Sequence, residues 1–248
     1  MTTNVYDITQ QVMTGDSRWS IYNDSWPFTV FVDDTGFDKL FSFKTHGIDY
    51  AVMFAGCSVL INDWKEWLKN GGYAGNPVRP AVYVDDRTIT ICLVNVATNQ
   101  ILMEYGQDIV IDDARFAGSG ARHAEQCWVL NKCAKKAVGS AMESDPCTGG
   151  TVKFFELATL SNNLDLTTTV DILKSSFLDK GTVMYKTATK GTVLPFREAA
   201  AKDTEVQAVM DDVASGRITS SAPCGAMHKQ WPNEKENELD EALKKIFL

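Results

Sequence analysis

Short strand-like segments follow one another along this chain in consecutive runs and do not alternate strictly with helices. Candidates lie at 4–13, 16–20, 39–43, 49–55, 81–85, 88–95, 101–105, 109–112 and 151–157. Parallel neighbours need a long crossover, usually a helix, whereas consecutive strands with short turns pair antiparallel. This order argues against an alternating strand–helix fold and predicts an α+β protein built on antiparallel sheets.

Apolar residues at helical spacing predict the helices that cover these sheets. A first helix begins at Ser58 and ends before Gly71, and a second covers 121–138 after a Gly-Ser-Gly stretch. Further helices are expected at 163–178, 196–214 and 234–247. Two sheets between two layers of helices would bury every apolar face, so the predicted fold is a four-layer αββα sandwich.

Charge and composition exclude several classes of function. The 248 residues carry a net charge of −8 and no basic cluster, which argues against nucleic acid and against an anionic membrane surface. No apolar run is long enough to span a bilayer, and the first residues do not resemble a signal peptide. Six scattered cysteines are typical of reduced thiols in a cytoplasmic protein. Three dispersed histidines predict no metal site, and nothing indicates a cofactor.

The N-terminus carries a candidate catalytic group. Thr2 follows the initiator Met1, and its side chain is small enough for an aminopeptidase to remove that methionine. The product would have an α-amine and a hydroxyl on one residue, so that the amine can act as the general base for its own hydroxyl. A retained Met1 would cap the base and silence the site.

Four separated stretches resemble elements of the proteasome β-type N-terminal-nucleophile (Ntn) hydrolases, in the family's order. They are MTTN at the start, TGDSRWS at 14–20, DKLFSF running on to YAVMFAGCSVLINDWKEWL, and GSGARHA followed by SDPCTGGTVKFFEL. Together they span residues 2–157. The resemblance implies an Ntn-hydrolase sandwich with a C-terminal helical extension.

The resemblance also implies roles for particular residues. Thr2 would be the nucleophile and, through its amine, the base. An ion pair of Asp16 with Lys39 would lie beside it, although an insertion at 26–28 leaves Lys44 as an alternative lysine. The residues expected to orient the amine are Ser119, Asp145 and Thr148.

Substrate contacts follow from the same resemblance. The backbone N–H of Gly56 would form the oxyanion hole, and Ser20 would pair with an extended peptide as an added strand. Phe54 would form the floor of a shallow apolar pocket that binds the residue before the cleaved bond. The bulky Trp19 would narrow the substrate groove.

The predicted organisation is a proteasome-like core at 1–160, its completion by helices at 161–214, and a loop with an amphipathic helix at 215–248. The predicted function is an N-terminal threonine peptidase that assembles into a homo-oligomeric ring and acts on peptides or unfolded chains, with an ATP-driven unfoldase as a possible partner. One alternative is a catalytically silent scaffold or binding subunit. The other is a small-molecule amidase or acylase with the same chemistry.

Overall fold

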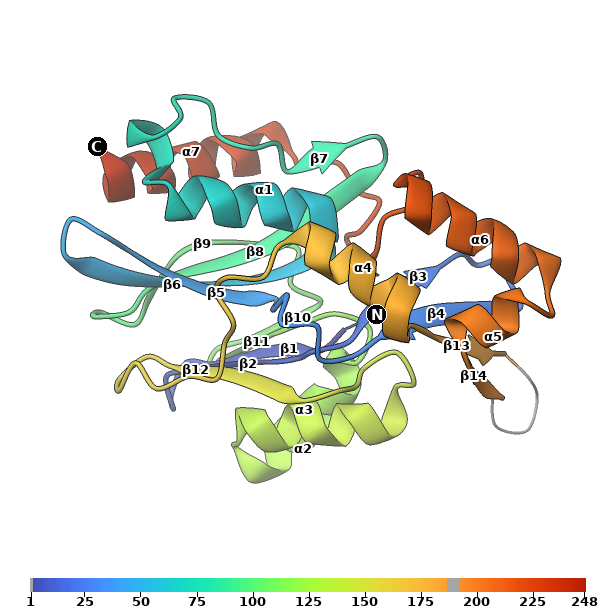
Figure 1. The fold of residues 1–248 in the computed structure, drawn as a ribbon. Coiled ribbons are helices and arrows are strands. Elements are labelled where there is room, and N and C mark those ends of the chain that lie inside the picture. Colours follow the sequence, from blue (N-terminus) through green and yellow to red (C-terminus); the bar gives the residue numbers. More distant parts are fainter. Residues whose placement is uncertain (1, 187–191) are drawn as a thin grey trace.

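The computed structural model describes residues 2–186 and 192–248, which form fifteen strands and seven α-helices (Figure 1). The strands are β1 (Asn4–Asp7), β2 (Val12–Asp16), β3 (Trp19–Tyr22), β4 (Phe28–Val32), β5 (Leu40–Thr45), β6 (Ile48–Cys57), β7 (Tyr83–Val84), β8 (Arg87–Asn95), β9 (Gln100–Tyr105), β10 (Ile109–Ile111), β11 (Ala114–Ala117), β12 (Val152–Glu156), β13 (Thr182–Tyr185), β14 (Val193–Pro195) and β15 (Ser221–Ala222). The helices are α1 (Ser58–Lys69), α2 (Ala121–Asn131), α3 (Ala134–Ser144), α4 (Val170–Lys180), α5 (Phe196–Ala200), α6 (Thr204–Ser215) and α7 (Asn233–Phe247).

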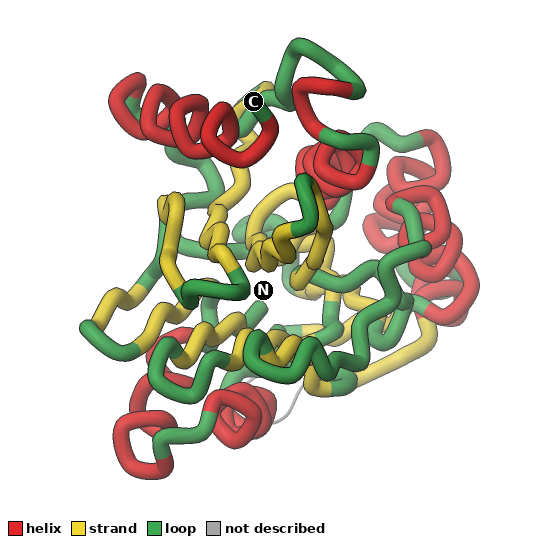
Figure 2. The backbone as a smooth tube through the Cα atoms, turned by 90° about the vertical axis from the view of Figure 1, so that its left-hand side faces the viewer, coloured by secondary structure: helices red, strands yellow, loops and turns green. Residues whose placement is uncertain are grey.

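Two antiparallel sheets of unequal size organise these elements. The smaller has the order β10-β11-β1-β2-β12, and α2 and α3 pack on it over a separate apolar cluster. The larger, of ten strands, has the order β14-β13-β4-β3-β15-β6-β8-β7, with β5 paired to β6 and β9 paired to β8. Figure 2 shows the N-terminal end of the chain in the interior of the molecule, where Thr2 and Thr3 are fully buried.

The prediction of a four-layer αββα Ntn sandwich with a helical extension is wrong. The fold is α+β with two large antiparallel sheets, but they are unequal, with five strands in one and ten in the other. Strands β4, β13 and β14 of the larger sheet carry their own helices, α4 and α5 (Figure 1). The chain after residue 160 is not a helical appendage, because it supplies β13, β14 and β15 to the larger sheet. One apolar core contains residues from all three predicted segments, among them Phe54, Phe177 and Leu239.

Several boundaries differ from the sequence prediction for local reasons. The first hairpin turns at residues 8–11, and Thr14 and Gly15 lie inside β2. The predicted helix at 121–138 is two helices, because Lys132 adopts a left-handed conformation with φ 46° and reverses the chain. The apolar face of α7 is buried against β9, the 3₁₀ turn at Gly72–Ala74 and the side chains of Trp67 and Phe43.

Candidate active site

A buried ion pair lies directly beside Thr2. Lys39 Nζ contacts Asp16 Oδ1 at 2.8 Å, and both side chains are at most 1% exposed. Thr2 Oγ1 donates to the same Oδ1 at 2.5 Å, and the Thr3 N–H donates to it at 2.8 Å. A single carboxylate oxygen, Asp16 Oδ1, therefore accepts from both the Thr2 hydroxyl and the Lys39 ammonium.

Strand ends bring these three residues together. Asp16 closes β2, and its N–H donates to Thr3 O at 3.1 Å, which aligns the start of β1 with the end of β2. Lys39 immediately precedes β5, and its carbonyl accepts from the Phe54 N–H of β6 at 2.8 Å. The site thus lies where the smaller sheet meets the larger one.

Burial sets the electrostatics of Lys39. Removal from water lowers the pKa of Lys39, and the Asp16 carboxylate opposes that effect. Lys39 Nζ also donates to Asp16 O at 2.7 Å and lies 5.5 Å from the Trp19 ring. The alternative lysine, Lys44, is 60% exposed and pairs with Asp49 on the surface. Of the two candidate lysines, the structure brings only Lys39 to Thr2.

Three further predicted residues form a hydrogen-bonded group on the other side of the N-terminus. Asp145 Oδ2 accepts from Ser119 Oγ at 2.6 Å and from Thr148 Oγ1 at 2.7 Å. Thr148 Oγ1 in turn lies 2.8 Å from Thr3 Oγ1. Asp145 follows α3 and Ser119 precedes α2, so a helical hairpin closes the group from one side.

The turn after α3, residues 145–150, joins this group to the ion pair. Asp145 holds the turn by accepting the Cys147 N–H at 3.1 Å. Further along the turn, the Gly149 N–H donates to Asp16 Oδ2 at 3.2 Å. The aspartate, the hydroxyl and the glycine of this stretch therefore each contact the site.

Glycine is required at two positions around the N-terminus. Gly56 has φ +111°, and a Cβ there would lie 2.2 Å from Thr88 O. Gly118 has φ +103°, and a Cβ there would lie 2.0 Å from Thr2 O. Gly56 keeps the expected oxyanion donor in a backbone conformation that a side chain would strain. Gly118 lets the loop at 118–120 before α2, here called the α2 entry loop, contact Thr2.

The predicted substrate residues lie on the larger sheet. Ser20, on β3, is 1% exposed, and its Oγ has no hydrogen-bond partner among the residues that the structure describes. Phe54 is fully buried in the main core two positions before Gly56 on β6. Its carbonyl accepts from Asn4 Nδ2 at 2.7 Å, which ties β6 to β1.

Sequence reasoning missed three residues of this site. Thr3 bridges the two hydrogen-bonded groups, and Asn4 anchors β1 on β6. Asp108 accepts the N–H groups of Gly118 and Gly225 and so links the α2 entry loop to the C-terminal part of the chain. The Thr2–Thr3 pair was the available signal for Thr3, because adjacent residues of an extended segment point to opposite sides.

Two sequence comparisons with known proteins identify no family for this chain. No protein-family model matches the chain, and no curated protein is significantly similar to it. Within residues 2–186 and 192–248, no group of three or more His, Cys, Asp or Glu side chains is placed to hold a metal ion. In the same part of the chain, every helix is too short or too polar to cross a membrane.

Proposed function

We propose that this chain is an amide hydrolase whose nucleophile is Thr2. The observation that carries the proposal is the contact of the Thr2 hydroxyl with Asp16, whose carboxylate is ion-paired to the fully buried Lys39. The Asp16 carboxylate orients the Thr2 hydroxyl by accepting its hydrogen bond, and the Lys39 ammonium beside it offsets the carboxylate's charge and favours a neutral amine as the base.

In the proposed reaction, removal of Met1 frees the α-amine of Thr2. The amine takes the hydroxyl proton while Oγ1 attacks the amide carbonyl, and the oxyanion that forms accepts the Gly56 N–H. Collapse breaks the C–N bond, the amine returns the proton to the leaving nitrogen, and a Thr2 ester remains. Water activated by the same amine then hydrolyses the ester. Ser119, Asp145 and Thr148 would orient the amine.

Peptides are the proposed substrates, as in the proteasome β-type hydrolases that the sequence resembles. The space between β3 and β6 supports this, because β15 of the same chain lies there as an antiparallel strand, which is the form in which an extended peptide would bind. Assembly into a ring and delivery by an ATP-driven unfoldase stay predictions.

A catalytically silent binding subunit is the second candidate, and one observation favours it. Thr2 is 0% exposed, and the groove beside Gly56 and Ser20 is filled by β15 of the same chain. A site closed in this way binds and hydrolyses nothing until it opens.

Fluorogenic peptides and small acyl-amides test the two candidates together. Intact mass spectrometry first determines whether Met1 has been removed. Hydrolysis is then compared between the native chain and Thr2→Ala. Thr9→Ala is the matched control, because Thr9 lies in the exposed turn after β1. The enzyme reading predicts that hydrolysis is lost only in Thr2→Ala. Equal hydrolysis rates in all three chains would show that Thr2 does not catalyse the reaction and would favour the silent binding subunit. A preference for acyl-amides over peptides would instead identify a small-molecule amidase.

A further inference from the structure

The groove between β3 and β6 is occupied by a segment from far along the chain. Ser221 of β15 lies opposite Ser20 on one side and Cys57 on the other, and Ala222 lies opposite Gly56. Both pairings are antiparallel. A two-residue strand from residues 221–222 therefore completes the sheet at the place where a peptide substrate is expected to add.

The register places the Ala222 carbonyl on the proposed oxyanion donor. In an antiparallel pair, positions that exchange N–H···O=C bonds alternate with positions that do not. The Ser58 N–H donates to Ser220 O at 3.1 Å, so the next exchanging position is Gly56 opposite Ala222. The alternative hydrogen-bond pattern for the Gly56–Ala222 pair would need a backbone N–H at residue 223, and Pro223 has none. The Gly56 N–H thus faces Ala222 O, as it would face the carbonyl of a bond to be cleaved.

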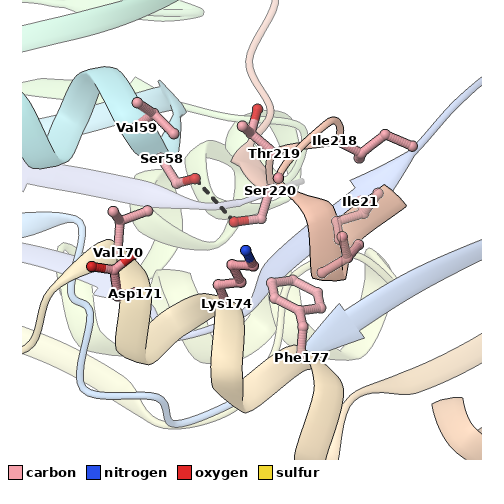
Figure 3. Close-up of a pocket in the computed structure, with 12 residues that line it drawn as sticks. Ile21, Ser58, Val59, Val170, Asp171, Lys174, Phe177, Ile218, Thr219 and Ser220 are labelled. Atoms are coloured by element: carbon pink, nitrogen blue, oxygen red, sulfur yellow. Dashed lines mark hydrogen bonds between the residues drawn. The ribbon is translucent and has the colours of Figure 1, made fainter. Parts of the chain in front are cut away.

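Contacts on both sides hold this segment in place. Ser220 Oγ donates to Ser58 Oγ at 3.0 Å, at the start of α1 (Figure 3). On the other side, Asp108 Oδ1 accepts the Gly225 N–H at 2.8 Å. The second oxygen of Asp108 accepts the N–H of Gly118, the glycine that touches Thr2. The segment is therefore fastened to the site at each end.

Side chains along the segment define the space available to a substrate. By the same register Trp19 lies opposite Ala222, and both residues are completely buried, so only a small side chain fits there. Ser220 instead borders a mostly apolar cavity of about 190 Å³. Figure 3 shows this cavity between α1, α4 and the segment, with Lys174 pointing into it. A larger apolar side chain would fit in place of Ser220.

We propose that residues 217–227, here called the strap, are a built-in competitor for the substrate groove. A peptide binds only when it displaces the strap, and it fits best with a small residue at the Ala222 position and a larger apolar residue at the Ser220 position. The proposal rests on the proposed function, because it takes Gly56 and Ser20 as parts of a substrate groove. A tethered competitor acts at an effective concentration in the millimolar range, so free peptides bind weakly while it is in place.

Peptide binding tests the strap independently of catalysis. The full chain in a Thr2→Ala background is titrated against fluorescein-labelled Ile-Thr-Ser-Ser-Ala amide and Ile-Thr-Leu-Ser-Ala amide, with anisotropy as the readout. Ser221→Pro removes the backbone N–H of the first residue of β15 and should tighten binding of both peptides by about tenfold or more. The leucine peptide should bind more tightly than the serine peptide. Equal affinities with and without Ser221→Pro would overturn the proposal.

A disulfide lock covers the case in which Ser221→Pro does not fold. Ser221 and Cys57 are directly opposed at a non-exchanging position, where the Cα separation of about 4.5 Å suits a disulfide. Oxidised Ser221→Cys should bond to Cys57 and lose peptide binding, and reduction should restore it. Ser220→Cys is the matched control, because it faces Ser58 and not a thiol. Failure of the bond to form, or unchanged peptide binding after it forms, would refute the strap.

The two proposals fail in distinguishable ways. Tighter peptide binding in Ser221→Pro, together with no hydrolysis in any chain that retains Thr2, would keep the strap and reject the enzyme. Hydrolysis that depends on Thr2 but is unaffected by Ser221→Pro or by the disulfide would keep the enzyme and reject the strap.

Discussion

The Gly149 N–H donates to Asp16 Oδ2 at 3.2 Å and joins two parts of the site that lie 133 positions apart in the sequence. Asp16 thereby accepts hydrogen bonds from the N-terminus, from the ion-paired lysine and from the turn after α3. A carboxylate with so many donors holds its charge in a buried place at reduced cost. Its position depends on all of them, so changes in any one should affect the others.

Loss of Lys39 should be severe. Lys39→Met leaves the Asp16 charge buried without its cation and should lower the free energy of unfolding by about 3–5 kcal/mol. The double variant Asp16→Asn with Lys39→Met should recover most of that loss, since no unpaired charge remains. Lys44→Met is the control and should change stability by about 0–1 kcal/mol. Urea unfolding measures all three, and equal losses for the two lysines would contradict the assignment of Lys39.

Substitution of Gly56 should be costly for steric reasons. Alanine at this φ of +111°, with its Cβ 2.2 Å from Thr88 O, should destabilise the chain by about 2 kcal/mol or more. Gly139→Ala lies in α3 with open space around it and should stabilise the chain by about 0.5–1 kcal/mol. Thermal unfolding distinguishes the two, and a neutral Gly56→Ala would show that β6 does not need this backbone shape.

A second buried lysine predicts a pH-dependent stability. Burial lowers the pKa of Lys65 from 10.5 to about 8, and its ammonium lies 4.1 Å from the Phe37 ring centre. Between these pH values the unfolded chain binds more protons than the folded one, so stability should rise with pH, by at most about 1.4 kcal/mol per unit. Lys65→Met should lack this rise. Urea unfolding from pH 7 to pH 10.5 measures the difference between the two chains, in which other titrating groups cancel. Parallel curves would contradict the lowered pKa.

The C-terminal helix should contribute to stability within one chain. Phe247 is 5% exposed and packs against Trp67 and Phe43, so Phe247→Ala should cost about 3–5 kcal/mol. Leu248→Ala, at an 85% exposed position, should cost almost nothing. Light scattering should give the same particle mass for both. A change of mass in Phe247→Ala at unchanged stability would instead place the partner of α7 on another subunit.

The sequence predicted several elements well from the spacing of their apolar residues. The strand before Gly56, the helix from Ser58 and the helix ending near Phe247 were predicted within a few residues, because burial fixes their periodicity. Antiparallel pairing was also predicted from the strand order. The four-layer arrangement was wrong because β13 and β14 are short strands in a weakly patterned stretch, and only pairing with β4 makes them strands.

The candidate site was predicted only where a motif existed. Thr2, Asp16, Lys39, Ser119, Asp145 and Thr148 do lie together, but their roles remain predictions. The strap could not be foreseen. Residues 215–233 have the composition of a loop, and Ser221 and Ala222 have no apolar pattern of their own. They are a strand because Ser20 and Gly56 flank them in space.

Covalent trapping at Thr2 tests the central claim most directly. The chain and its Ser221→Pro variant are incubated with a peptide β-lactone, which acylates a nucleophilic hydroxyl, and analysed by intact and peptide-level mass spectrometry. The Ser221→Pro variant is included because a strap that occupies the groove could block the lactone even where Thr2 is an active nucleophile. We predict that Met1 is absent and that one acyl group is bonded to Thr2, with none in Thr2→Ala. A retained Met1, or an acyl group on any residue other than Thr2, would contradict the assignment.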